Sequence, residues 1–289
     1  MKNVTLNEIL LKASKEGWAL GHFNISNIEQ LRAIVMAAQS LKTPVHIGTS
    51  GGERNFIGFR QAVYMVRAFR EEFDLPIFLN ADHFKSVEEA RAVVDAGYDS
   101  IHIDLSAKSL KENIAGVREI VEYAKSRNAD ISIEAELGFL RGESKIQKEK
   151  IDIKPEDLTK PDEAAYFVQE TRVDRLAPVV GNIHGISANE PELDIDRIRQ
   201  IHEAVPGTIL VLHGGSGIPE RQIKEAIRAG ISNIHVNTEI RIAYTDALRQ
   251  ALRDNPDETT PYKLFPGVLA AVEGKVKEKL ALFGSMNRI

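Results

Sequence analysis

The sequence contains no cysteine, which excludes disulfide bonds and thiolate metal ligands. A metal ion would therefore have to be bound by histidine, aspartate or glutamate. No segment approaches the roughly 18 consecutive apolar residues that a membrane-spanning helix needs. Residues 1–24 interrupt their apolar positions with Asn, Glu, Lys and Ser, unlike the apolar core of a signal peptide. We therefore expect a cytoplasmic protein without a membrane partner.

A basic surface is lacking as well. The 289 residues include 37 Lys and Arg against 42 Asp and Glu, which gives a formal net charge of −5. This balance does not indicate nucleic acid or an anionic membrane as a partner. With 43% hydrophobic and 27% charged residues, the composition is that of a globular protein with one large core or two modest domains.

Short apolar or β-branched runs alternate with segments of helical periodicity from end to end. Strands are predicted at 18–24, 43–50, 75–83, 99–106, 130–138, 175–185, 208–217 and 233–239. Helices are predicted at 27–41, 56–73, 86–96, 108–127, 162–171, 192–204, 219–229 and 239–253, with one more near the C-terminus at 270–284. Eight β-α units in about 250 residues predict a TIM (β/α)8 barrel, formed by residues 1–289 as a single domain.

Two features of this pattern leave alternatives. A doubly wound open sheet usually carries a glycine-rich fingerprint after its first strand, and none stands at 24–27, which favours the barrel. The connection at 139–161 is long, charged and punctuated by Gly and Pro. A loop of this length is either a functional lid or disordered.

Histidines collect in the strands. Seven of the eight lie in or at the end of a predicted strand: His22, His46, His83, His102, His184, His213 and His235. The C-terminal strand ends of a barrel converge on one mouth. Three of these histidines end the third, sixth and seventh strands, and Glu136 lies near the end of the fifth.

Three imidazoles with an open position are a usual way to bind catalytic Zn²⁺, so the pattern predicts a metal site at the mouth of the barrel. For any one of these histidines alone, a hydrogen-bonded core residue is the alternative. His46 and His102 fall in the middle of their strands, and for these two we expect the core.

Asp82 and His83 are adjacent in the predicted strand 75–83, where successive side chains should point to opposite faces. The ladder ends at these residues, so the pleat need not hold and both side chains can reach one site. Asp82 would then exchange a proton with a substrate at the metal. A surface-facing Asp82 is the alternative.

The segment 213–217 reads HGGSG, and Pro219 opens the next helix. Glycines allow successive N–H groups to form an anion nest, and the helix N-terminus adds a positive dipole end. TIM barrels frequently bind phosphate in the loops after strands 7 and 8. The segment predicts a phosphate site, with an ordinary tight turn as the alternative.

Six motifs, NADH, IDLSAKSLKENI, IEAELG, GNIHG, HGGSGIP and VNTE, resemble in order and spacing those of the class II, metal-dependent ketose-bisphosphate aldolases, including fructose- and tagatose-bisphosphate aldolases. The resemblance covers essentially the whole chain. It implies a carbon–carbon lyase that cleaves or forms a phosphorylated ketose through a zinc-stabilised enediolate of dihydroxyacetone phosphate. It also implies a homodimer or homotetramer.

The resemblance assigns roles to particular residues. It implies a metal site formed by His83, Asp104, Glu136, His184 and His213. It implies proton exchange with the C4 hydroxyl by Asp82 and a catalytic loop glutamate at Glu143. It implies substrate, phosphate and monovalent-cation contacts for Asn24, Gly185, Gly214, Ser216, His235, Asn237 and Thr238.

Four positions depart from the family pattern. His235 stands where Asn is usual, and 186–188 read Ile-Ser-Ala where Tyr-Lys usually follows the histidine. Ser144 stands at the usual position of the loop glutamate, next to Glu143. Tyr262 lies near the position at which the family usually has a phosphate-binding arginine. Together they suggest a different aldehyde partner, an unphosphorylated partner, or a non-catalytic metal-binding barrel.

Two other chemistries are disfavoured. A zinc hydrolase on the same barrel commonly has a His-x-His pair on its first strand, which here ends GHFN. A Schiff-base aldolase needs a lysine at a strand end, and we expect none there.

Overall fold

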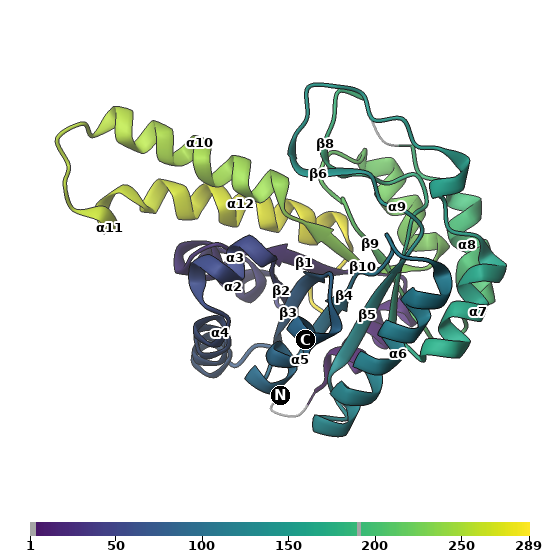
Figure 1. Ribbon diagram of the computed structural model, residues 1–289. Coiled ribbons are helices and arrows are strands. Elements are labelled where there is room, and N and C mark those ends of the chain that lie inside the picture. Colours follow the sequence, from purple (N-terminus) through teal and green to yellow (C-terminus); the bar gives the residue numbers. More distant parts are fainter. Residues whose placement is uncertain (1–3, 190–191) are drawn as a thin grey trace.

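Eight parallel strands close into a barrel. The computed structural model describes residues 4–189 and 192–289, and the strands follow the order β1-β10-β9-β7-β5-β4-β3-β2 around the barrel (Figure 1). Their bounds are β1 Leu20–Asn24, β2 Val45–Thr49, β3 Ile77–Phe84, β4 Ser100–Ile103, β5 Ser132–Leu137, β7 Arg175–Pro178, β9 Ile209–Leu212 and β10 Ile231–Val236. The predicted TIM barrel is confirmed, and each strand matches a predicted one.

Helices surround the barrel at the predicted places. Their bounds are α2 Ile28–Leu41, α4 Phe59–Phe73, α5 Val87–Ala96, α6 Leu110–Arg127, α7 Pro161–Thr171, α8 Ile195–Ala204, α9 Glu220–Ala229 and α10 Thr238–Asp254. One predicted helix, 56–73, is wrong at its start. The chain there forms α3 Gly51–Ile57 and α4, divided at Gly58.

The first helix, α1 Leu6–Glu16, was not among the predicted elements. Its apolar face, with Leu6, Ile9 and Leu10, packs on the first residues of two barrel strands, Leu20 of β1 and Ile209 of β9. It therefore closes the N-terminal end of the barrel, opposite the mouth.

The predicted sixth strand, 175–185, is wrong as a single strand. β7 ends at Pro178, and β8 His184–Ile186 leaves the barrel to pair with β6 Gly142–Ile146 in a separate two-stranded sheet. The break coincides with Gly181, which has a φ of 101°. Glycine adopts this backbone conformation readily and other residues rarely do. The segment 139–161, expected as a lid or disordered loop, supplies β6 and the short helix η1 Pro155–Asp157.

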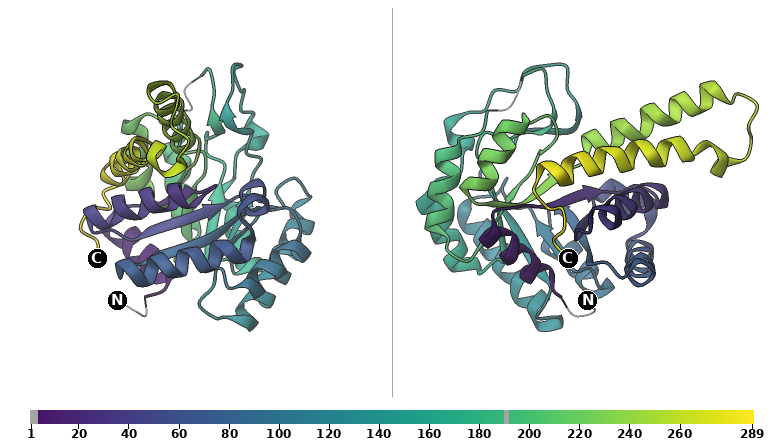
Figure 2. Two further views of the ribbon diagram at one scale, coloured as in Figure 1. Left: turned by 90° about the vertical axis from the view of Figure 1, so that its left-hand side faces the viewer. Right: turned by 180° about the vertical axis from the view of Figure 1, so that it is seen from behind.

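A helical hairpin extends from the barrel. It consists of α10, the short α11 Pro261–Leu264 at its tip, and α12 Pro266–Leu282. Figure 1 and the right-hand view of Figure 2 show it projecting well beyond the other helices. The predicted C-terminal helix is therefore confirmed, although it begins earlier than expected. Among the residues described, no helix is both long and apolar enough to cross a bilayer.

The packing of α1 generates a prediction from two neighbouring leucines. Leu10 is fully buried and Leu11 is 38% exposed. Leu10→Ala should lower the free energy of unfolding by about 2–5 kcal/mol because it leaves a cavity. Leu11→Ala is the matched control and should change it by less than about 0.5 kcal/mol. Urea unfolding of both variants checks this, and equal effects would contradict the assigned face of α1.

Candidate metal centre

A cavity of about 290 Å³ opens at the C-terminal ends of the barrel strands. Of the site residues predicted from the sequence, those lining it are Asn24, Asp82, His83, His184, Gly185, His213, Gly214, Ser216, His235, Asn237 and Thr238. Glu136 and Asp104 lie buried beside it, 2% and 3% exposed. The structure thus gathers residues from distant parts of the sequence at one place.

The predicted loop glutamate is the exception. Ser144 lines the cavity, whereas the Glu143 side chain is 72% exposed and pairs with Lys145 at 2.6 Å. The catalytic role assigned to Glu143 stays a prediction, and in this structure its carboxylate faces away from the cavity.

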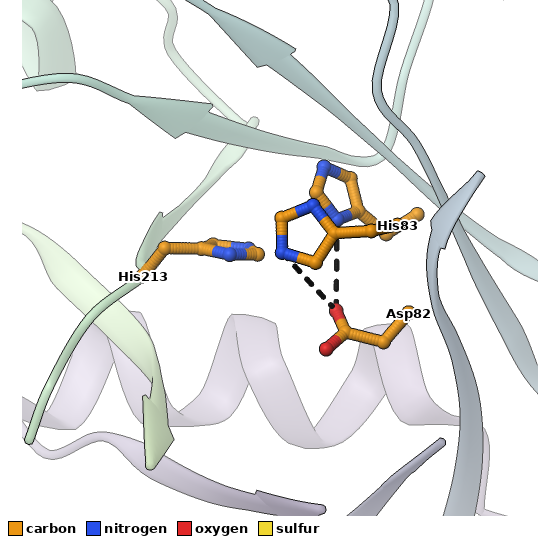
Figure 3. A group of neighbouring side chains, drawn as sticks. Asp82, His83 and His213 are labelled. Atoms are coloured by element: carbon orange, nitrogen blue, oxygen red, sulfur yellow. Dashed lines mark ion pairs between the residues drawn. The ribbon is translucent and has the colours of Figure 1, made fainter. Parts of the chain in front are cut away.

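Three imidazoles converge: His83 from β3, His184 from β8, and His213 directly after β9. The ring centroids of His83 and His184 are 4.9 Å apart, those of His83 and His213 are 4.9 Å apart, and those of His184 and His213 are 6.0 Å apart. Figure 3 shows the His83 and His213 rings approaching each other, with the Asp82 carboxylate beside them. The three rings therefore border one space, but the groups whose ligand atoms all lie within 4.8 Å of one another include His83 and His213 and not His184.

A break in β3 explains how Asp82 and His83 face the same site. The pairing of β3 with β4 shifts register between Ala81 and Phe84, and His83 has a φ of 55°. This bulge turns the His83 ring toward the side already occupied by Asp82, so that Asp82 Oδ1 lies 4.0 Å from His83 Nε2. The expected failure of the pleat is therefore observed, and the surface-facing alternative for Asp82 is wrong.

The donor set fits a divalent cation. His83, Asp104 and Glu136 can each place one ligand atom within 4.8 Å of the others. Asp82 Oδ1, Glu136 Oε2 and His184 Nε2 are buried and have no hydrogen-bond partner in the part of the chain described here. Buried polar atoms without partners are rare in folded proteins, and a cation would satisfy these.

The pKa values of His83, Glu136 and His184 reflect the close packing of these buried groups. Burial alone would lower the pKa of His83, but the Asp82 and Asp104 carboxylates outweigh it and raise that pKa to about 9. Burial, together with the nearby Asp104, raises the pKa of Glu136 to about 7. Burial holds the pKa of His184 well below its usual range, so its imidazole is neutral, the form that binds metals.

Glu134 was missed by the sequence analysis. Its Oε1 lies 2.6 Å from His213 Nε2, which leaves Nδ1 of that ring as the atom free to bind a metal. Burial disfavours its charge, but the buried Arg175 guanidinium outweighs this and holds the pKa of Glu134 well below its usual range. The pattern IEAE could have revealed it, because Glu134 and Glu136 share one face of β5.

A polar layer fills the barrel beneath the cavity. His22 stacks on His235 with centroids 3.5 Å apart and planes 10° apart, and His46 Nε2 hydrogen-bonds Ser100 Oγ at 2.9 Å. The interior of a TIM barrel is usually filled by branched apolar side chains. His46 is buried as expected of a core residue.

His102 was also expected in the core. It is fully buried, but its ring centroid lies 4.4 Å from that of His83 and 4.7 Å from that of His213. Its burial agrees with the expected core position, and its ring also borders the candidate metal centre. Because β4 is only four residues long, its middle already lies close to the mouth.

The HGGSG segment forms a tight turn beside the histidines. Gly214 has a φ of 67°, and a Cβ there would lie 1.8 Å from the carbonyl oxygen of Ile183, so only glycine fits. Part of the nest is already occupied, since the Gly217 N–H donates to Glu239 Oε1 at 2.9 Å. Gly214 and Ser216 face the cavity and remain the groups placed to meet an anion.

Two cations line the cavity, Lys85 and Arg241. Lys85 directly follows β3, and its ammonium pairs with Asp104. The expectation that no lysine stands at a strand end is therefore wrong.

A (β/α)8 barrel with histidines and carboxylates at its C-terminal mouth defines the class of metal-dependent barrel enzymes. Residues 4–288 match the family described as "Fructose-bisphosphate aldolase class-II". The chain is 37% identical to the fructose-bisphosphate aldolase of Geobacillus stearothermophilus, over 100% of this chain and 99% of that protein. It is 35% identical to the fructose-bisphosphate aldolase of Staphylococcus epidermidis, with the same coverage.

Solved structures agree. The crystal structure of the YdjI aldolase from Escherichia coli K12 aligns with a TM-score of 0.84 at 31% identity, over 98% of each chain. The chain belongs to the class-II fructose-bisphosphate aldolase family, which is generally metal-dependent. The resemblance, the fold and the predicted enzyme class, a carbon–carbon lyase, are thereby confirmed.

The raised pKa values generate a prediction about metal affinity. A divalent ion must displace the protons of His83 and Glu136, whose pKa values are about 9 and about 7. Zinc affinity should therefore rise as the pH increases from about 6 to about 9 and level off above. Competition with a chromogenic chelator, corrected for the protonation of the chelator, measures this. A flat affinity across that range would contradict the assignment of these two residues as ligands.

Proposed function

We propose that this protein catalyses the reversible aldol cleavage of a phosphorylated ketose such as fructose 1,6-bisphosphate. The observation that carries the proposal is the convergence of His83, His184 and His213 beside Asp82 at the mouth of the barrel. The names of the aligned relatives, which cover the whole chain, support the substrate class.

The metal would be held by His83, His184 and His213, with Glu136 as a carboxylate ligand and Asp104 beside them. Zinc is the ion we propose, because imidazole and carboxylate ligands suit it. When bound, it supplies a Lewis acid that polarises the ketone oxygen of the substrate.

Asp82 is the proposed acid and base. Burial works against its charge, but His83 and the neighbouring rings hold the pKa of Asp82 well below its usual range, so it is a carboxylate at neutral pH. In the cleavage direction it accepts the C4 hydroxyl proton, and in the condensation direction it returns that proton. Asn24 Nδ2 donates to Asp82 Oδ2 at 3.1 Å and orients the carboxylate.

Gly214 and Ser216, with Gly185 and the start of α10 at Asn237 and Thr238, form the proposed cradle for the phosphate of the dihydroxyacetone half. These groups line the cavity, and backbone N–H groups and the N-terminus of α10 favour an anion there. A monovalent cation beside this phosphate remains part of the proposal.

His235 lines the cavity next to His213, with their ring centroids 4.2 Å apart. We propose that it contacts the substrate near the reacting carbons.

The identity of the aldehyde half is less constrained. Tyr262 is 73% exposed at the tip of the hairpin, outside the cavity of its own chain. A different or unphosphorylated aldehyde is therefore the second candidate for the acceptor.

The projecting hairpin supports the proposed homodimer or homotetramer, because it offers a surface that its own barrel does not cover. The cytoplasmic location expected from the sequence stays a prediction.

The role of Asp82 is tested by Asp82→Asn. This variant should lower kcat for fructose 1,6-bisphosphate cleavage by about 100- to 10,000-fold, with a small change in KM, because it removes the proton acceptor and keeps the shape. Asp162→Asn, on the surface of α7, is the control. A coupled assay with zinc-loaded protein measures both, and wild-type kcat in the Asp82 variant would overturn the assignment. Failure of the wild-type protein to cleave any phosphorylated ketose would overturn the proposed function.

The phosphate cradle is tested by Gly214→Ala. The new Cβ would collide with the Ile183 carbonyl, so the turn must move and KM for the phosphorylated ketose should rise by at least about tenfold. Gly274→Ala is the matched control, because its Cβ would meet open space in α12. Steady-state kinetics of the two variants, at matched zinc occupancy, make the comparison. An unchanged KM in Gly214→Ala would show that the turn does not bind the phosphate.

A further inference from the structure

We propose that His102 is a fourth imidazole of the metal centre, which together with His83, His213 and Asp82 forms an inner coordination set. The inference rests on the proposed metal-dependent function and goes beyond it, because it adds a ligand to the set of three histidines and Glu136.

Two triangles of imidazoles share the His83–His213 edge. The outer triangle has His184 as its third ring, with centroid separations of 4.9, 4.9 and 6.0 Å. The inner triangle has His102 instead, with separations of 4.4, 4.7 and 4.9 Å. The inner triangle is therefore the more compact of the two.

A carboxylate completes the inner triangle. Asp82, His83, His102 and His213 can each place one ligand atom within 4.8 Å of all the others. Asp82 Oδ1 lies 3.6 Å from His102 Nδ1 and 4.0 Å from His83 Nε2. These contacts are too long for hydrogen bonds. They are close to the roughly 3.4 Å that separates neighbouring ligand atoms around a tetrahedral zinc with bonds of about 2.1 Å.

The nitrogens of His102 lack partners in the part of the chain that the structure describes. The side chain is fully buried, and neither Nδ1 nor Nε2 makes a hydrogen bond. Carboxylate oxygens flank both nitrogens, with Glu134 Oε1 at 3.8 Å from Nδ1 and Glu136 Oε2 at 3.7 Å from Nε2. His46, by contrast, uses its Nε2 to bond Ser100.

The inner set gives Asp82 a second role. A metal ion bound to one oxygen of a carboxylate makes that carboxylate a weaker base. Asp82 is therefore the stronger proton acceptor when its oxygen is not a ligand. Coordination through His184 and Glu136 leaves it free for that purpose.

The test compares three leucine variants of the full-length protein: His102→Leu, His184→Leu and His46→Leu. After removal of metal with a chelator, each is titrated with Zn²⁺ against a chromogenic competitor and with Co²⁺ while visible absorption is recorded. His102→Leu should weaken Zn²⁺ binding by about tenfold or more and change the intensity of the Co²⁺ bands. His46→Leu should leave both as in the wild type.

Folding does not obscure this result. Replacing a buried ring that has no hydrogen-bond partner by an apolar side chain leaves no polar group unsatisfied, so the apo variant should melt near the wild-type temperature. His102→Gln provides a second substitution of different shape.

Wild-type Zn²⁺ affinity and an unchanged Co²⁺ spectrum in both His102 variants would overturn this inference alone. The proposed metal-dependent function would stand if His184→Leu still weakened binding. Absence of metal binding by the wild-type protein would overturn both.

Discussion

The whole centre depends on the break in β3 at Asp82 and His83. A left-handed φ in a residue other than glycine costs of the order of 1–3 kcal/mol and persists only where the surroundings enforce it. Arg54 provides that enforcement, because its guanidinium donates to the carbonyl oxygens of Thr49 and of Asp82, at 2.9 Å for the latter. The same guanidinium lies 4.0 Å above the Phe84 ring. One arginine thus holds the Asp82 carbonyl group before His83 and packs on the Phe84 ring after it.

The polar interior of the barrel is the second constraint. Glu134 and Arg175 are both fully buried, and removing the partner of a buried charge is much more costly than replacing the whole pair by apolar groups. Arg175 also donates to Ser132 Oγ at 3.0 Å and to Asn233 Oδ1 at 3.3 Å. Charge, hydrogen bonding and the orientation of His213 are therefore coupled in one network, which fixes the geometry of the mouth from below.

Much of the fold could be predicted from the sequence, because the parallel strands are nearly continuous apolar runs bounded by turn residues. The histidines at the strand ends were also recognisable, because the topology of a barrel brings those ends together. The path of the chain after Pro178 was not predictable from apolar pattern, since the residues up to His184 are as buried as a strand but make no barrel ladder.

The positions that individual side chains reach were the other feature that the sequence did not predict. His102 reaches the centre because β4 is short, and Glu143 faces away because the small β6–β8 sheet presents Ser144 to the cavity instead. Such orientations depend on strand length and register, which composition and periodicity do not specify. Glu134 was within reach of sequence reasoning, but it was overlooked beside the more conspicuous Glu136.

The position of α10 has a consequence for how the sequence of this protein can change during evolution. Its first turn contributes Thr238 and Glu239 to the neighbourhood of the glycine turn, and its far end lies in the projecting hairpin. Lys279 of α12 pairs with Glu239 at 2.7 Å, so the hairpin is anchored at its base, next to the chemistry. Substitutions at the distal end of the hairpin can therefore accumulate and alter its contacts, while the anchored end keeps the reaction geometry unchanged.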